Sequence, residues 1–397
     1  MKRTVYFDHA ATTPLHPKAL EAMLPYLNDR FGNPSGAYVL GRQAARAVDE
    51  ARRTVAEVLG CRPREVVFTG AGTESINLAI KGVAFALKLA GMGNHIVTST
   101  AEHHAVLHSC EYLERFGFET TYVPVDRFGM VSPQAVADAL TDRTVLVSVM
   151  LANNEVGTIN PVAEVAAAVR ERGKKLQRRI PVHTDAVQAA NSLELSVQAL
   201  GVDLLSLSSH KFYGPKGTGV LYIRGGTPLL ALQSGGGQER QRRSGTENVA
   251  AIVGTAAALR LAQESRAEHS TLSRRLRDRI VEGVLTAVPA ATLNGHRQRR
   301  LPNNAHFSFE GAESDDMLAA LDKRGVAASA GSACTSATWE PSHVLVAMGV
   351  PLARAVAALR LTVGPDNTDD EVDYLLSLLP QVVAESRAKS RGGASPK

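Results

Sequence analysis

The chain has 397 residues, 44% of them hydrophobic, with 33 glycines and 18 prolines, a composition typical of a soluble α/β enzyme of more than one domain. A net charge of +5 would suit nucleic acid, but aromatic residues make up only 5% and do not interleave with the basic ones, so we expect no direct nucleic-acid partner. No apolar run of about 18 residues could span a membrane, and we see no signal peptide. The three scattered cysteines argue against disulfides and a metal site, which predicts a reducing cytoplasm.

The segment from about residue 65 to 225 alternates short β-rich runs with helical patterns. Such alternation favours a mainly parallel sheet with crossover helices. Ligands of these sheets collect beyond the carboxyl ends of the strands. Polar side chains directly after a predicted strand are therefore candidate ligand-binding groups.

The pattern changes after residue 245, where long helices precede a strand, a helix, a Gly/Ser/Ala loop and a last strand. We expect a large domain over residues 14–260 and a small α+β domain over 261–397, the latter completed by residues 1–13. The Ser/Gly/Ala/Lys-rich tail, residues 386–397, is expected to be disordered.

The lysine at position 211 lies just past the apolar run of residues 202–207, between Ser208, His210 and a Gly-Pro turn. Desolvation can leave a lysine amine neutral, and a neutral amine attacks carbonyls. The hydroxyl and imidazole beside it are donors suited to a phosphate. These residues suggest pyridoxal phosphate bound as an imine on Lys211. The alternative is a solvated turn lysine.

Four other predicted strand ends also carry candidate groups. The glycine turn at Gly72 and Thr73 opens a helix that could bind an anion, or is a plain tight turn. Asp185 could pair with a pyridinium nitrogen while Gln188 donates to the ring oxygen, or Asp185 caps a helix. His103 could stack on the cofactor, or is a surface histidine. The amide of Asn154 suits substrate or ring oxygens, or belongs to an ordinary turn.

Two further candidates come from the second half of the chain. Residues 329–336 are small throughout, so we expect Cys334 to be exposed on a mobile loop, where a nucleophilic thiol is more plausible than a structural one. Arg360 stands in an otherwise apolar strand, where it either clamps a carboxylate or forms a structural ion pair.

Together these motifs resemble the cysteine desulfurases of the aminotransferase class V family, and the similarity covers nearly the whole chain. It rests on the lysine motif, on residues 183–188, on the Ser-Ala-Gly-Ser-Ala-Cys-Thr-Ser run around Cys334, and on the opening Asp-His-Ala-Ala-Thr-Thr-Pro. The Ser-Ala-Cys-Thr run followed by Glu-Pro-Ser resembles the group with a long, mobile cysteine loop. The resemblance implies the aspartate aminotransferase-like fold, with a seven-stranded, mainly parallel sheet in the large domain.

The resemblance also implies roles for individual residues. Lys211 would carry the cofactor, Cys334 would accept sulfur from L-cysteine as a persulfide with release of L-alanine, and His103 would stack over the ring. Arg360 and Asn154 would hold the substrate. Thr246 would reach the phosphate in a second subunit, which implies a homodimer. The remaining cofactor contacts would come from Gly72, Thr73, Asn154, Asp185, Gln188, Ser208 and His210.

Several alternatives stay open from the sequence. A selenocysteine lyase or a class V aminotransferase is the nearest rival activity, and a basic scaffold or nucleic-acid-binding protein is a rival of another class. The acceptor of the sulfur could be an iron–sulfur scaffold or a thiolation enzyme, and DNA phosphorothioation or cofactor sulfuration also remain. One departure from the family pattern is Tyr38, which stands where a histidine is usual and predicts altered packing near the cleft entrance.

Overall fold

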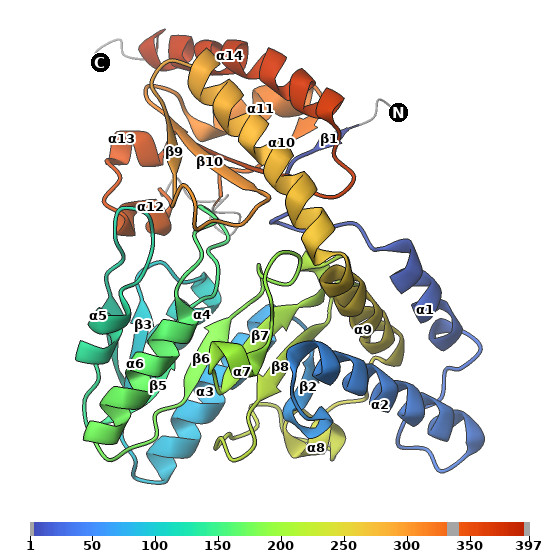
Figure 1. Ribbon diagram of the computed structural model, residues 1–397. Coiled ribbons are helices and arrows are strands. Elements are labelled where there is room, and N and C mark those ends of the chain that lie inside the picture. Colours follow the sequence, from blue (N-terminus) through green and yellow to red (C-terminus); the bar gives the residue numbers. More distant parts are fainter. Residues whose placement is uncertain (1–3, 332–340, 393–397) are drawn as a thin grey trace.

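A seven-stranded sheet forms the centre of the larger of two lobes in the computed structural model, which describes residues 4–331 and 341–392 (Figure 1). The strand order is β2-β8-β7-β6-β5-β3-β4. Strands β4, β3, β5, β6 and β7 run parallel, and β8 is antiparallel to both of its neighbours, as expected for a mainly parallel sheet. The strands are β2 (Val66–Thr69), β3 (His95–Ser99), β4 (Glu119–Val123), β5 (Thr144–Ser148), β6 (Val182–Asp185), β7 (Leu204–Ser208) and β8 (Gly219–Ile223).

Helices cover both faces of this sheet because its strands bury alternate residues on opposite sides. Val66 and Phe68 of β2 pack in one hydrophobic cluster, whereas Val67 packs in the other. The first cluster includes helices α1 (Pro17–Leu27), α2 (Val39–Leu59), α5 (Pro133–Asp138), α6 (Val162–Lys175), α7 (Val197–Leu200) and α9 (Val249–Glu264). The second includes α3 (Gly72–Leu89) and α4 (His104–Glu114). Short helices η1 (Pro63–Glu65), η2 (Ser209–Lys211) and α8 (Gln238–Gln241) lie in connections.

The smaller lobe is built on a three-stranded antiparallel sheet, in the order β12-β10-β9. Its strands are β9 (Ala291–Asn294), β10 (Asn304–Phe309) and β12 (Ala358–Thr362). Helices α10 (Arg266–Ala287), α11 (Ser314–Lys323) and α14 (Asp369–Gly392) pack on it in one hydrophobic cluster, and the lobe also contains α12 (His343–Ala347) and α13 (Leu352–Ala355). None of the helices in the described part of the chain has the length and apolarity that a membrane crossing requires.

The N-terminal residues pair with the smaller lobe. Strand β1 (Val5–Tyr6) lies parallel to β11 (Val326–Ala327), and Asp8 forms a bridge to Thr362 of β12. Helix α9 ends at Glu264, four residues past the predicted boundary at residue 260. The division into domains 14–260 and 261–397, with 1–13 joined to the latter, stays a prediction.

The prediction of a disordered tail from residue 386 is wrong for its first seven residues, because α14 continues to Gly392. The polar side chains that made this segment look solvated bind the rest of the smaller lobe. The hydroxyl of Ser386 accepts from the Glu313 N–H at 2.9 Å, and Arg387 donates to the carbonyls of Glu310 and Pro289. Residues 393–397 lie outside the described part of the chain.

Candidate active site

A cavity of about 310 Å³ lies at the carboxyl ends of the parallel strands and is lined by residues of both lobes. It contains most of the side chains that the sequence singled out, and these come from segments as far apart as the turn after β2 and the middle of β12. Parallel strands present their carboxyl ends at one edge of a sheet, which explains the convergence. The predicted site residues that line it are Gly72, Thr73, His103, Asn154, Asp185, Gln188, Ser208, His210, Lys211 and Arg360.

One of the predicted residues does not line this cavity, and another lies outside the described part of the chain. Thr246 is exposed on the connection between α8 and α9 and does not line it. Cys334 lies outside the described residues, although Gly331, three positions earlier, lines the cavity. Tyr38 is also elsewhere, since it precedes α2 with 57% of its surface exposed.

The amine of Lys211 is held by the N-terminal segment. Lys211 ends the short η2 helix after β7, and its Nζ donates to the carbonyls of Ala10 at 2.7 Å and Ala11 at 2.6 Å. The backbone of the lysine is fixed as well, because the Asn191 side-chain amide donates to its carbonyl at 2.7 Å. Lys211 therefore lies in the cavity with its amine held by polar contacts and is not a solvated turn lysine.

Asp185 ends β6 and is only 5% exposed. Burial raises the pKa of its carboxyl to about 6, although the Val187 N–H, 2.9 Å from Oδ1, and the charge of Lys211 oppose the shift. A carboxylate buried in this way favours a cationic N–H partner. The neighbouring Gln188 donates from Nε2 to the Ala10 carbonyl at 3.0 Å. Asp185, Gln188 and Ala10 all line the cavity, so this hydrogen bond joins the N-terminal segment to the part of the wall that follows β6.

His103 precedes α4 and caps it, since its Nδ1 accepts from the Ala105 N–H at 3.0 Å. The accepting nitrogen carries no proton, so the neutral ring keeps its proton on Nε2. Burial lowers the pKa of His103 to about 4, with a further contribution from the positive charge of Lys211. The ring is therefore neutral at physiological pH, which suits stacking on a flat cationic ring.

Another end of the cavity has the donors expected of a phosphate site. Helix α3 begins at Gly72, whose N–H points to the Ser208 hydroxyl at 3.3 Å. A Cβ added to Gly72 would lie 2.9 Å from the Ser208 Cβ, so only glycine fits this close approach. Unpaired N–H groups at the start of α3 favour an anion. His210 lies beside them, with its Nδ1 3.0 Å from the Thr12 hydroxyl.

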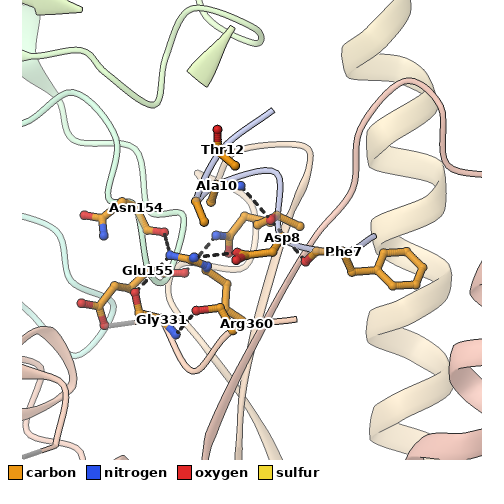
Figure 2. Close-up of polar contacts among 12 residues, drawn as sticks. Phe7, Asp8, Ala10, Thr12, Asn154, Glu155, Gly331 and Arg360 are labelled. Atoms are coloured by element: carbon orange, nitrogen blue, oxygen red, sulfur yellow. Dashed lines mark hydrogen bonds and ion pairs between the residues drawn. The ribbon is translucent and has the colours of Figure 1, made fainter. Parts of the chain in front are cut away.

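Arg360 is the charged residue of the smaller lobe that lines the cavity, and it is only 2% exposed. Figure 2 shows its polar contacts. Its Nη2 lies 2.8 Å from Oδ1 of Asp8, and its Nη1 donates to the carbonyls of Asn154 and Gly331 at 2.8 and 3.1 Å. The ion pair weighed as one alternative is therefore present. Its buried Nε–H has no partner among the described residues, so a donor remains for a carboxylate.

Some residues of the cavity were missed by the sequence analysis. The carbonyls of Ala10 and Ala11 act through the backbone, so no side-chain pattern could have marked them. Glu155 and His343 also line the cavity. Glu155 directly follows the candidate residue Asn154, and His343 directly follows the Glu-Pro-Ser run. The signal in the sequence was therefore their position next to these motifs.

Comparisons with known proteins agree with this geometry. The family model described as aminotransferase class-V matches residues 5–375. A protein named cysteine desulfurase IscS from Methanosarcina thermophila is 48% identical over 388 residues, which cover 98% of this chain and 94% of that protein. An IscS-like cysteine desulfurase from Mycobacterium tuberculosis is 46% identical, with 98% of this chain and 99% of that protein covered.

Solved structures share the fold over nearly the full length. A NifS-like protein superposes with a TM-score of 0.89 at 38% identity, covering 96% of this chain and all (100%) of that chain. A structure described as SspA in complex with cysteine gives a TM-score of 0.79 at 36% identity, covering 92% and 100%. These matches favour an enzyme over the alternative of a basic scaffold. The chain belongs to the aminotransferase class-V family, and within that family it groups with the cysteine desulfurases.

Proposed function

We propose that this protein is a pyridoxal phosphate-dependent cysteine desulfurase, which converts L-cysteine to L-alanine and holds the sulfur as a persulfide on Cys334. The single observation that supports it most is the convergence of three residues on one cavity: Asp185 from the end of β6, Lys211 from just after β7, and Arg360 from the middle of β12. Family membership favours the cofactor. The substrate is favoured by the similarity to a protein whose structure was solved with cysteine.

The cavity fits this cofactor on structural grounds. Gly72 and the start of α3 leave room for a phosphate, and the buried carboxylate of Asp185 matches a protonated ring nitrogen. The neutral ring of His103 can lie against the flat face of the cofactor. When bound, the cofactor withdraws electrons from Cα of the substrate, which makes the Cα proton removable.

The residues of this chain then divide the remaining work. Arg360 binds the substrate carboxylate through its Nε–H, which has no partner among the described residues, and the Lys211 amine moves the proton at Cα. The Cys334 thiolate attacks the substrate sulfur; an S–S bond forms, the Cβ–S bond breaks, and the carbon takes up a proton to give alanine. The sulfur is oxidised as the carbon is reduced, so no external oxidant is needed.

Two parts of the proposal concern partners. An exposed apolar surface formed by Leu20, Leu24 and Leu27 of α1, with Phe31 beyond it, supports a homodimer. Thr246 does not line the cavity of its own chain. It is therefore available to contribute to the phosphate site of a second subunit. The acceptor of the sulfur is a protein with a thiol, and an iron–sulfur scaffold in the cytoplasm is the one that the resemblance favours.

Three proteins test the function: the parent chain, Lys211→Ala and Cys334→Ala. We expect the parent reconstituted with pyridoxal phosphate to form one alanine per sulfur released from L-cysteine. Lys211→Ala should lose both the absorption of the covalently bound cofactor and alanine formation. Cys334→Ala should keep that absorption but lose the persulfide. Full sulfide release by Cys334→Ala without an added thiol would contradict the proposal, and a keto acid product would indicate an aminotransferase.

A further inference from the structure

An ion pair lies beside the end of the cavity that is proposed to bind the cofactor phosphate. Glu74 is in the first turn of α3, the helix whose start forms that end. Its Oε1 accepts from Nε of Arg243 at 2.8 Å, and its Oε2 lies 3.3 Å from Nη2 of the same residue. The two residues are 169 positions apart in the chain. Neither of them lines the cavity itself.

Glu74 also holds the turn that leads into α3. Its Oε2 accepts from the Gly70 N–H at 2.7 Å, two residues before Gly72. A Cβ added to Gly70 would lie 2.7 Å from the same oxygen, so any other residue at position 70 would displace the carboxylate. Two residues of chain span at most about 7 Å, which places the carboxylate within about 10 Å of the Gly72 N–H.

A carboxylate at this place opposes the binding of a phosphate. The start of a helix favours negative charge, and Glu74 already supplies one in that first turn. A phosphate bound at Gly72 would bring a second anion within about 10 Å, a distance over which charges still act on one another at physiological ionic strength. The two anions repel each other unless a cation compensates one of them.

Arg243 provides such a cation. Its Nε and Nη2 both face the carboxylate of Glu74, an arrangement that fixes the guanidinium in direction as well as in distance. The side chains are 24% and 31% exposed, so solvent screens the pair only in part. His210 does not replace this charge, because burial lowers its pKa to about 4 and leaves the ring neutral at physiological pH.

The segment that carries Arg243 is anchored independently. Glu239 of α8 is buried and accepts from Nη1 and Nη2 of Arg52 at 2.7 Å and from the Phe68 N–H at 3.0 Å. Figure 1 shows α8 next to α2 and β2, the elements of those two partners. Residues 239–241 have positive φ throughout, which non-glycine residues adopt only where other contacts hold them. Arg243 is therefore held in place from its own side as well.

We propose that Arg243 is a positioning residue for the cofactor, which fixes and compensates the carboxylate of Glu74 and thereby sets the affinity of the cavity for a phosphate group. The inference rests on the proposed function, because that function places the phosphate at the start of α3. Without Arg243, the carboxylate of Glu74 would repel the phosphate. Without Glu74, the guanidinium would attract it. Removing one charge or the other should therefore change the affinity in opposite directions.

Binding of two aldehydes to the cofactor-free protein tests this inference. Pyridoxal phosphate carries the phosphate and pyridoxal lacks it, so the ratio of their Kd values isolates the phosphate contribution. We expect Arg243→Gln to raise the Kd for pyridoxal phosphate about threefold to tenfold, the size of charge effects at a helix start, and to leave the Kd for pyridoxal unchanged. High ionic strength should reduce the difference.

Arg324→Gln is the matched control for this measurement. Arg324 pairs with Glu385 at 2.8 Å, its side chain is 26% exposed, and it does not line the cavity. The control variant should therefore keep the Kd values of the parent for both aldehydes.

Two further variants separate charge from structural support. Glu74→Gln keeps an acceptor for the Gly70 N–H and removes the charge, so it should bind pyridoxal phosphate at least as tightly as the parent. The double variant, Arg243→Gln with Glu74→Gln, should return to within about twofold of the parent. The proposal is wrong if Glu74→Gln weakens binding as much as Arg243→Gln does, or if the double variant binds as weakly as Arg243→Gln.

The outcomes distinguish the inference from the function on which it rests. A parent protein that binds pyridoxal phosphate no more tightly than pyridoxal would overturn the proposed function and the inference together. A parent that prefers the phosphorylated aldehyde, with an unchanged Kd in Arg243→Gln, would overturn the inference alone. Equal weakening of both aldehydes in Arg243→Gln would also overturn it, because it would indicate damage to the cavity rather than an uncompensated charge.

Discussion

Arg360 and Asp8 form an ion pair of 2.8 Å across 352 positions of the chain. The pair joins β12 to the segment after β1, and it holds the guanidinium in one orientation at the cavity. A buried cation without a partner would be strongly destabilising. The pair therefore explains how a strand of the smaller lobe can carry a permanent charge at the site.

The first prediction concerns Arg360→Lys. A lysine cannot hold Asp8, two carbonyls and a substrate carboxylate with one ammonium group. We expect the KM for L-cysteine to rise about tenfold to a hundredfold, or about 1.4 to 2.8 kcal/mol, with a smaller change in kcat. Steady-state alanine formation measures both constants. Arg354→Lys is the control, because Arg354 pairs with Glu310 on the surface; an unchanged KM in Arg360→Lys would exclude a clamp.

The second prediction concerns Asp185→Asn, which keeps the shape of the side chain and removes its charge. Without a buried carboxylate the ring nitrogen is not held protonated, so kcat should fall about a hundredfold or more while the cofactor still binds. Turnover and cofactor absorption measure the two effects. Asp203→Asn serves for comparison, since Asp203 pairs with Arg179 and Arg224 and does not line the cavity; it should retain kcat.

The third prediction is that one thiol reacts much faster than the other two. Burial raises the pKa of Cys61 and of Cys110 to about 12, so at pH 8 only about one thiol in ten thousand is ionised at either position. Brief treatment with iodoacetamide, followed by peptide mass spectrometry, should find the label on Cys334. Rapid labelling of Cys61 in the native protein would contradict this prediction.

The fourth prediction is a loss of stability in mild acid. Burial lowers the pKa of His183 and of His306 to about 3, whereas an unfolded histidine has a pKa near 6.5. The folded state therefore binds fewer protons in this interval. The contribution of these two residues to stability is greatest above pH 6.5 and falls on acidification, by up to about 2.7 kcal/mol per pH unit.

Effects of opposite sign come from Asp185 and Glu102, because burial raises their pKa values to about 6 and about 8 and so favours the folded state in acid. Urea unfolding of the cofactor-free protein at pH 7, 6 and 5 measures the net slope. His183→Gln should reduce that slope by about one proton. An unchanged slope in His183→Gln would show that this histidine is protonated in the folded state.

The fifth prediction tests the apolar surface of α1. Leu24→Asp places a charge on a side chain that is 53% exposed in the single chain and would be buried in a homodimer. Sedimentation should give twice the chain mass of 42.2 kDa for the parent and the single mass for the variant. Leu89→Asp is the matched control, because Leu89 is 80% exposed at the end of α3. A monomeric parent would refute the homodimer.

The sequence predicted the cavity well because its polar residues follow strands. Asp185, Ser208 and Lys211 come directly after apolar β-rich runs, and parallel pairing then brings them to one sheet edge. It could not predict the contacts of Lys211, because these are with backbone carbonyls of Ala10 and Ala11. It also failed for residues 386–392, where polar side chains that suggested a solvated tail are used to bind the smaller lobe.

The first dozen residues have a practical consequence for anyone who alters this protein. Within a few positions they add a strand beside β11, the counter-ion of Arg360, both acceptors of the Lys211 amine and the hydroxyl beside His210. Trimming the chain back to the start of α1 would remove none of the residues proposed to bind the cofactor or the substrate. It would nevertheless remove the contacts that hold Lys211 and Arg360 in the cavity, so a fusion partner is better placed at the opposite terminus.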